Sequence, residues 1–135
     1  MNMTTFHLKI VTPDRLVYDG QAERLVIRTV GGDVCILARH IDYAAPLDIG
    51  QAHIVDEEGK TRQAACSGGM LTVYGGEAVV MATTFEWADE IDRERAQQAQ
   101  QAAEEKLKNL KRDDREFMVA SAKLKRAIAR IGASE

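Results

Sequence analysis

The sequence has little of what marks a membrane-spanning, secreted or nucleic-acid-binding protein. No stretch approaches the roughly 18 consecutive apolar residues that a membrane span needs. The beginning, MNMTTFHLK, has no basic head followed by an apolar run, so we expect no secretory signal and a protein kept in the cytoplasm. The 18 Lys and Arg face 21 Asp and Glu, which gives a net charge of -3 and does not indicate a nucleic-acid-binding surface.

Cysteine and the patterns of catalytic sites are scarce as well. Cys35 and Cys66 lie in apolar, strand-like surroundings, and we expect both thiols to be buried and reduced rather than bridged. No close spacing of Cys or His indicates a metal site. There is no Gly-x-Ser-x-Gly and no His-Glu-x-x-His, so nothing places a base beside Ser67 or a Cys, and an enzyme is not indicated.

The composition changes abruptly at residues 86–96. Nine of the ten Gly, both Pro and six of the seven Phe, Trp and Tyr residues lie before Ala88. Behind it come mainly Ala, Gln, Glu, Lys and Arg, which is typical of surface helices. Residues 1–87 carry a net charge of -4 and residues 88–135 of +1. We therefore expect two differently built parts, 1–87 and 88–135, joined by a polar hinge.

Alternation of apolar and polar residues predicts β structure before the hinge. Phe6, Leu8 and Ile10 alternate with polar neighbours, and Leu25 and Ile27 do so again. Turn signals recur at short intervals, which favours a β-sandwich or flattened barrel of about eight to ten strands. The expected breaks are Asp19-Gly20, Gly31-Gly32-Asp33, Pro46, Gly50, residues 56–59, Ser67-Gly68-Gly69 and Gly75-Gly76.

After the hinge, apolar residues recur every three or four positions, which predicts two helices that form a hairpin. The expected seam consists of Ala96, Ala99, Ala103, Leu107 and Leu110 on the first helix and of Phe117, Ala120, Leu124, Ala127 and Ile131 on the second. Asp113 and Glu116 have the spacing of a capping box at the start of the second helix. Because Ala buries few CH2 groups, we expect the hairpin to be loosely docked and able to switch between two arrangements.

Four motifs in this order resemble the epsilon subunit of bacterial F-type ATP synthases. They are 6–14 (FHLKIVTPD), 32–40 (GDVCILARH), 67–73 (SGGMLTV) and 91–96 (IDRERA), and the resemblance runs from about Thr4 to Ile131. Two positions depart from it, since Cys35 and Ala38 stand where relatives commonly have Gly and Pro. The resemblance implies an α+β fold, a sandwich followed by a two-helix hairpin, and a non-catalytic rotor subunit on the cytoplasmic side of the bacterial cell membrane.

The resemblance also implies partners. The sandwich would bind the gamma subunit and rest on the c-ring, with Asp33 and His40 on the c-ring side of a shared loop region. The hairpin would extend along gamma into the catalytic alpha/beta ring and block ATP hydrolysis, or fold down and permit rotation. The residues expected to make inhibitory contacts in the extended state are Lys123, Lys125, Arg126 and Arg130. A plain solvated basic face is an equally good interpretation of these four cations.

In several relatives the folded-down hairpin binds regulatory ATP, and no other cofactor is implied. The residues that match the ATP motif are Ile91, Asp92, Arg95 and Ala96, and Glu86 falls at the acidic position before it. Glu86 or Asp92 would accept from the adenine amino group, and Ala96 leaves room for a ring. Arg126 and Arg130, four positions apart on one helix face, would join Arg95 in binding phosphates.

Other interpretations stay open. Arg126 and Arg130 would equally complement a helix dipole, while Asp92 would serve the first turn of its helix. Ala102 stands where ATP-binding relatives carry a further Arg, so we expect ATP to bind weakly. The alternative function is a β-sandwich adaptor whose helical tail packs on another helical protein.

Overall fold

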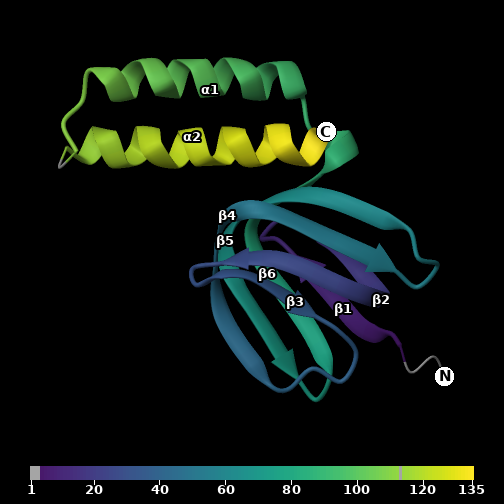
Figure 1. The fold of residues 1–135 in the computed structure, drawn as a ribbon. Coiled ribbons are helices and arrows are strands. Elements are labelled where there is room, and N and C mark those ends of the chain that lie inside the picture. Colours follow the sequence, from purple (N-terminus) through teal and green to yellow (C-terminus); the bar gives the residue numbers. More distant parts are fainter. Residues whose placement is uncertain (1–3, 113) are drawn as a thin grey trace.

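The computed structural model describes residues 4–112 and 114–135, which fold into a closed sheet followed by a helical hairpin (Figure 1). The strands are β1 (Phe6–Val11), β2 (Leu16–Thr29), β3 (Gly32–Ile36), β4 (Tyr43–Asp56), β5 (Thr61–Tyr74) and β6 (Glu77–Trp87). The helices are η1 (Ala88–Glu90), α1 (Arg93–Lys108) and α2 (Arg115–Ser134). This order confirms the predicted fold class, a β-sandwich followed by two helices.

The six strands pair in the order β1-β6-β5-β4-β2-β3, and β1 also pairs with β2, so the sheet closes into a flattened barrel. Neighbouring strands are antiparallel except β1 and β6, which run parallel. Phe6, Leu8, Ile10, Leu25 and Ile27 are all buried, as their alternation predicted. They belong to one core cluster, which also includes Trp87 at the end of β6.

The described residues form six strands rather than eight to ten, because several expected breaks lie inside long strands. Asp19 and Gly20 continue β2 and pair with Lys9 and Leu8 of β1. Gly68 and Gly69 have φ values of 66° and 104° within β5, so they bend the strand without ending it. Pro46 and Gly50 lie within β4 in the same way. Glycine and proline therefore lie inside three 14-residue strands without ending them.

The hairpin lies across one side of the sheet, and α2 contacts β4 and β5 while α1 packs on α2 (Figure 1). Ala96 and Ala103 are buried on α1, and Ala120 and Ala127 on α2, as predicted. Ala99 is exposed, so its assignment to the seam was wrong. The reason is helical phase: half-buried Gln100 lies four residues after Ala96 and three before Ala103, where the buried stripe passes.

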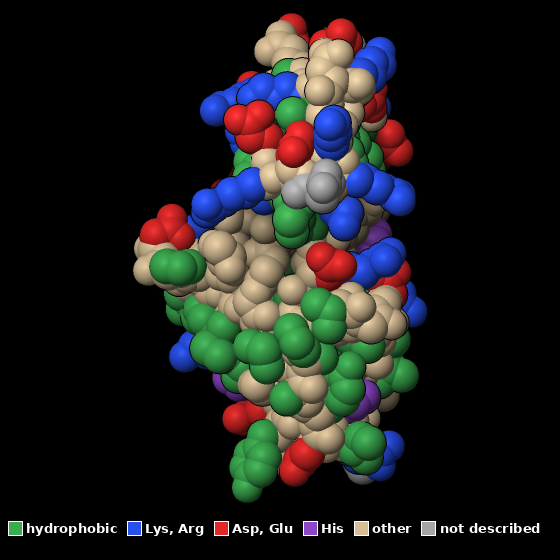
Figure 2. Space-filling view, turned by 90° about the vertical axis from the view of Figure 1, so that its left-hand side faces the viewer, with side chains coloured by type: hydrophobic (Ala, Val, Ile, Leu, Met, Phe, Trp, Pro, Cys, Tyr) green, Lys and Arg blue, Asp and Glu red, His purple; other side chains and the backbone are tan. Residues whose placement is uncertain are grey.

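An aspartate stands at the N-cap position of each hairpin helix; that of α1 makes a side-chain capping hydrogen bond, whereas that of α2 makes none. Asp92 is the N-cap of α1, and its carboxylate accepts from the Arg95 amide at 3.1 Å. The predicted capping box includes Asp113, which lies outside the described residues, and Asp114 is the N-cap of α2. Charged side chains cover the hairpin, whereas hydrophobic side chains gather on the sandwich below it (Figure 2).

Candidate functional site

The carboxylate of Glu86 and the guanidinium of Arg130 join the sheet to the hairpin. Arg130 Nε donates to Glu86 Oε1 at 2.6 Å, and both side chains are about one-third exposed, at 33% and 35%. Glu86 lies on β6 and Arg130 on α2. The sequence predicted that both residues would contact ATP, and the structure brings them together as partners of each other.

Arg126 lies beside this pair. Arg126, Arg130 and Glu86 line one small cavity of about 10 Å³, together with residues of β5 and β6. This confirms that the two arginines share a helix face. Neither lies in the last turn of α2, where a helix dipole is felt most, so that interpretation explains them poorly. The cavity holds about one water molecule and leaves no room for a nucleotide while the ion pair is closed.

The residues of the predicted ATP motif are placed differently. Asp92 caps α1, which confirms the structural interpretation of this residue. Ala96 is buried with 4% exposure, Ile91 packs against Ala65, Ala129 and Ala133, and Arg95 is exposed. The cavity beside Glu86 is lined by none of these four motif residues.

Arg15, which the sequence did not single out, fixes the hinge. Its guanidinium donates to both carboxylate oxygens of Glu90, at 3.0 and 2.9 Å, and to the Phe85 carbonyl at 3.1 Å. Glu90 also accepts from the Trp87 amide at 3.0 Å. The Arg15 hydrogen bonds hold the pKa of the Glu90 carboxyl below its ordinary value. Nothing local in the sequence marks this pair, because 75 positions separate its members.

The four cations proposed for inhibitory contacts do not form one face in this arrangement. Lys123 lines a groove between the helices with Lys106 and Arg115. Lys125 lines a separate cleft against β4. Arg126 and Arg130 face β6. In the docked hairpin Lys123 and Lys125 are exposed, whereas Arg126 and Arg130 are half-buried.

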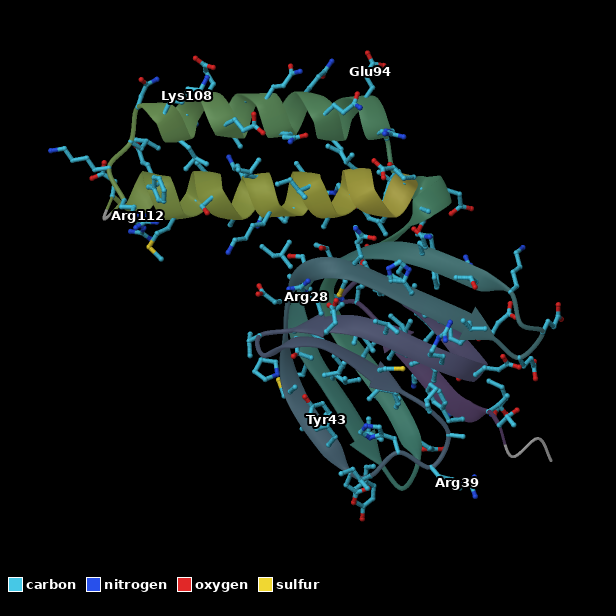
Figure 3. All side chains as sticks on the ribbon, viewed as in Figure 1. Arg28, Arg39, Tyr43, Glu94, Lys108 and Arg112 are labelled. Carbon is cyan, nitrogen blue, oxygen red and sulfur yellow. The ribbon has the colours of Figure 1, made fainter. Side chains whose placement is uncertain are left out.

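Asp33 and His40 lie at opposite ends of a strand, not in one loop. Asp33 is the second residue of β3 and forms an ion pair with Arg28, with 2.8 Å between Asp33 Oδ1 and Arg28 Nε. His40 lies beyond the end of β3, with its ring 5.9 Å from that of Tyr43. Figure 3 shows Arg28 near the hairpin, while Arg39 and Tyr43 lie towards the other end of the sandwich. Only His40 remains in the predicted loop.

The two cysteines differ. Cys66 is buried, and burial raises the pKa of its thiol to about 12. Cys35 is exposed, which corrects the expectation that both are buried, because its side of β3 faces away from the core. Within residues 4–112 and 114–135 no His, Cys, Asp and Glu cluster has a metal-binding arrangement. None of the helices described there is long and apolar enough to cross a membrane.

Comparisons with known proteins cover the whole chain. The family model for the beta-sandwich domain of the ATP synthase delta/epsilon chain matches residues 5–88, and that for its long alpha-helix domain matches residues 89–135. The ATP synthase epsilon chain of Bacillus velezensis is 40% identical over 129 residues, which are 96% of this chain and 96% of the relative. That of Caldanaerobacter subterraneus subsp. tengcongensis is 36% identical over 127 residues, 94% and 91% of the two chains.

Solved structures share the fold. A chain of the Euglena gracilis mitochondrial ATP synthase superposes with a TM-score of 0.85 at 22% identity, covering all of this chain and 85% of that one. A chain from the central stalk and c-ring of the Tetrahymena thermophila enzyme has a TM-score of 0.61 at 12% identity, with 96% of each chain covered. With both family models matched and relatives 36–40% identical over nearly its full length, the chain belongs to the family of ATP synthase epsilon chains.

Proposed function

We propose that this chain is a non-catalytic rotor subunit of a bacterial F-type, proton-translocating ATP synthase. It joins the gamma subunit to the c-ring on the cytoplasmic side of the cell membrane. Membership of the epsilon-chain family supports this role, and so does the fold shared with a chain from a structure described as central stalk and c-ring. Affinity purification from membranes is expected to retain gamma and c. Recovery of the chain without them would favour the adaptor alternative.

The loop 37–42 supports a contact with the c-ring. Leu37 is 52% exposed and Ile41 is 78% exposed, on either side of His40. Contiguous exposed apolar groups mark protein interfaces, and these two side chains share one short loop. Exchange of Ile41 for Asp is expected to weaken assembly. Leu16→Asp, at an exposed apolar side chain outside this loop, is the matched control.

The hairpin regulates ATP hydrolysis in this proposal, and the Glu86–Arg130 ion pair is the observation that carries it. The pair holds α2 on β6 through partly exposed groups, beside a contact made of alanines, so docking is reversible. The docked form permits rotation, and the extended form enters the alpha/beta ring with Lys123, Lys125, Arg126 and Arg130 available for contacts.

Two variants test this regulation because they act in opposite directions. Truncation after Ala88 removes the inhibitor and is expected to raise ATP hydrolysis by the assembled enzyme. Glu86→Ala weakens docking, favours the extended form and is expected to lower hydrolysis. Lys60→Ala, in the turn between β4 and β5, controls for assembly. Equal hydrolysis in all three enzymes would contradict the proposal.

We place regulatory ATP in a docked form whose ion pair has opened. Glu86 then faces the adenine, and Arg126 and Arg130 bind phosphates, with the motif residues Ile91, Asp92, Arg95 and Ala96 alongside. Binding to the docked form alone would stabilise it by about 2.7 kcal/mol at a hundred times Kd. Calorimetric titration of the whole chain is the test, with Arg126→Ala as the variant. Absence of heat at millimolar ATP would remove the site.

A further inference from the structure

A second cleft lies on the other side of α2 from the Glu86–Arg130 pair. Its volume is about 490 Å³, within the range of small-molecule sites. The sheet order places β4, β2 and β3 on this side and β5 and β6 on the other. The residues that line it are Val26, Arg28, Asp33, Asp48, Ile49, Gly50, Gln51, His53, Lys125, Ile128 and Ala129.

Arg28 is held in place across the floor of this cleft. It forms an ion pair with Asp33, with 2.8 Å between Nε and Oδ1, and its side chain runs over Gly50. A Cβ at position 50 would lie 2.6 Å from Arg28 Cβ and 2.8 Å from Cγ. Gly50 is not among the described glycines with positive φ, so this position needs glycine for space and not for its backbone. Arg28 is therefore preorganised, with its terminal nitrogens left over.

The other donors of the cleft have no hydrogen-bond or ion-pair partner among the described residues. They are the half-buried side chains of Gln51 and His53 on β4 and the ammonium of Lys125 on α2. The two carboxylates, in contrast, are engaged: Asp33 by Arg28, and Asp48 by the Ile49 amide at 2.8 Å. These partly or fully exposed groups bond to water in the free protein, and a polar ligand in the cleft would replace that water.

We infer that this cleft binds a small phosphate ester that carries hydroxyl groups. Arg28 and Lys125 supply the charged donors that phosphate prefers, and the side chains of His53 and Gln51 add two more polar groups. The remaining lone pairs of Asp33 and Asp48 accept from hydroxyl groups. The lining includes neither Glu86 nor Arg126 nor Arg130, so this inference does not depend on the ATP proposal.

The position of the cleft gives the ligand a regulatory effect. Arg28 and His53 belong to the sheet, while Lys125 and Ile128 belong to α2. Only the docked hairpin forms both walls, so a ligand that contacts both stabilises docking. Such a compound and the ion pair on the other side would favour the same state.

Titration of the isotope-labelled whole chain, followed by NMR at the Gly50 and Gln51 amides, tests the inference. The probes are ribose 5-phosphate and inorganic phosphate. Ribose 5-phosphate is expected to shift both signals at millimolar concentration and to bind about tenfold more tightly than inorganic phosphate. The Arg28→Gln and Lys125→Ala variants are each expected to bind ribose 5-phosphate about tenfold more weakly. The Lys60→Ala variant, which removes the same charge elsewhere, is expected to bind it with unchanged affinity.

Three results would overturn the inference. The first is no shift with either probe. The second is equal weakening by Lys60→Ala and Lys125→Ala, which would reduce the effect to net charge. The third is equal affinity for both probes, which would leave only an unspecific anion site. If Arg28→Gln loses binding while Lys125→Ala binds as tightly as the unmodified chain, the ligand does not bridge the sheet and the helix.

Discussion

The side-chain amide of Gln51 on β4 occupies the space that a side chain at Gly132 on α2 would need. Gly132 lies inside a helix, where Gly costs roughly 1 kcal/mol relative to Ala. The close approach of α2 to β4 thus uses a residue that weakens the isolated helix. Docking and helix formation make opposite demands at this position.

Gly132→Ala is expected to stabilise α2 and to weaken docking only slightly. The added methyl group favours the helix by about 1 kcal/mol, and the atom that it meets is the far end of the flexible Gln51 side chain, which can turn aside. Energy transfer between dyes on Cys35 and on an introduced Ser121→Cys measures docking, and circular dichroism measures helicity. Adding Gln51→Gly makes room and should remove even this small effect on docking. A Gly132→Ala variant whose hairpin is largely undocked would contradict this account.

The Glu86–Arg130 pair is expected to contribute about 0.5–1 kcal/mol to the free energy of unfolding, since both side chains are partly exposed. A double-mutant cycle with Glu86→Gln and Arg130→Gln in urea measures the coupling, which should fall at high salt. The Glu105–Lys108 pair, exposed on α1, is the control and should show almost none. Coupling insensitive to salt would argue against an ionic contact.

The Arg15–Glu90 contact is expected to make hinge stability depend on acid. The pKa of Glu90 is lowered by the Arg15 hydrogen bonds, from an ordinary value of 4.5. The stabilisation is therefore present above about pH 4.5 and is lost as the pH falls through the lowered value. In the Glu90→Gln variant, the free energy of unfolding should depend less on pH in this acidic range. Glu94→Gln, exposed on α1, should leave it unchanged.

His7 is expected to titrate above its ordinary pKa. Its hydrogen bond to Asp19 is the main cause, and Glu77 adds to it across the seam between β1 and β6. Since the pKa is raised from 6.5, the stabilisation is full below that pH and is lost as the pH rises through the folded value. NMR titration should show the pKa of His7 falling in Asp19→Asn. An unchanged pKa would mean that the contact does not persist in solution.

Thiol labelling should distinguish the cysteines. Cys35 is exposed, while Cys66 is buried with a pKa raised to about 12, so one thiol per chain should react near neutral pH. Both should react in denaturant. Cys35→Ser should abolish the native reaction, and reaction of two thiols in the folded chain would show that β5 opens.

Local pattern determined the class of fold. The alternation of Phe6, Leu8 and Ile10 and the seven-residue spacing of Ala120 and Ala127, about two helical turns, depend only on neighbours along the chain, so the sequence predicts their burial. The motifs identify the family for a similar reason, since their order and spacing are written along the chain. Asp92 at the start of α1 is another local feature, because its partner Arg95 lies three residues away.

Tertiary structure decided the contacts of the hinge. Glu86 meets Arg130 and Arg15 meets Glu90 across 44 and 75 positions, and which cation reaches which carboxylate depends on how α2 and the loop before β2 pack on the sheet. The same holds for the second cleft, whose donors come from β2, β4 and α2. Sequence spacing fixes which side chains share a face. Only packing brings two faces together, because long-range pairing follows from the closure of the whole sheet and from the position of the helix that lies on it.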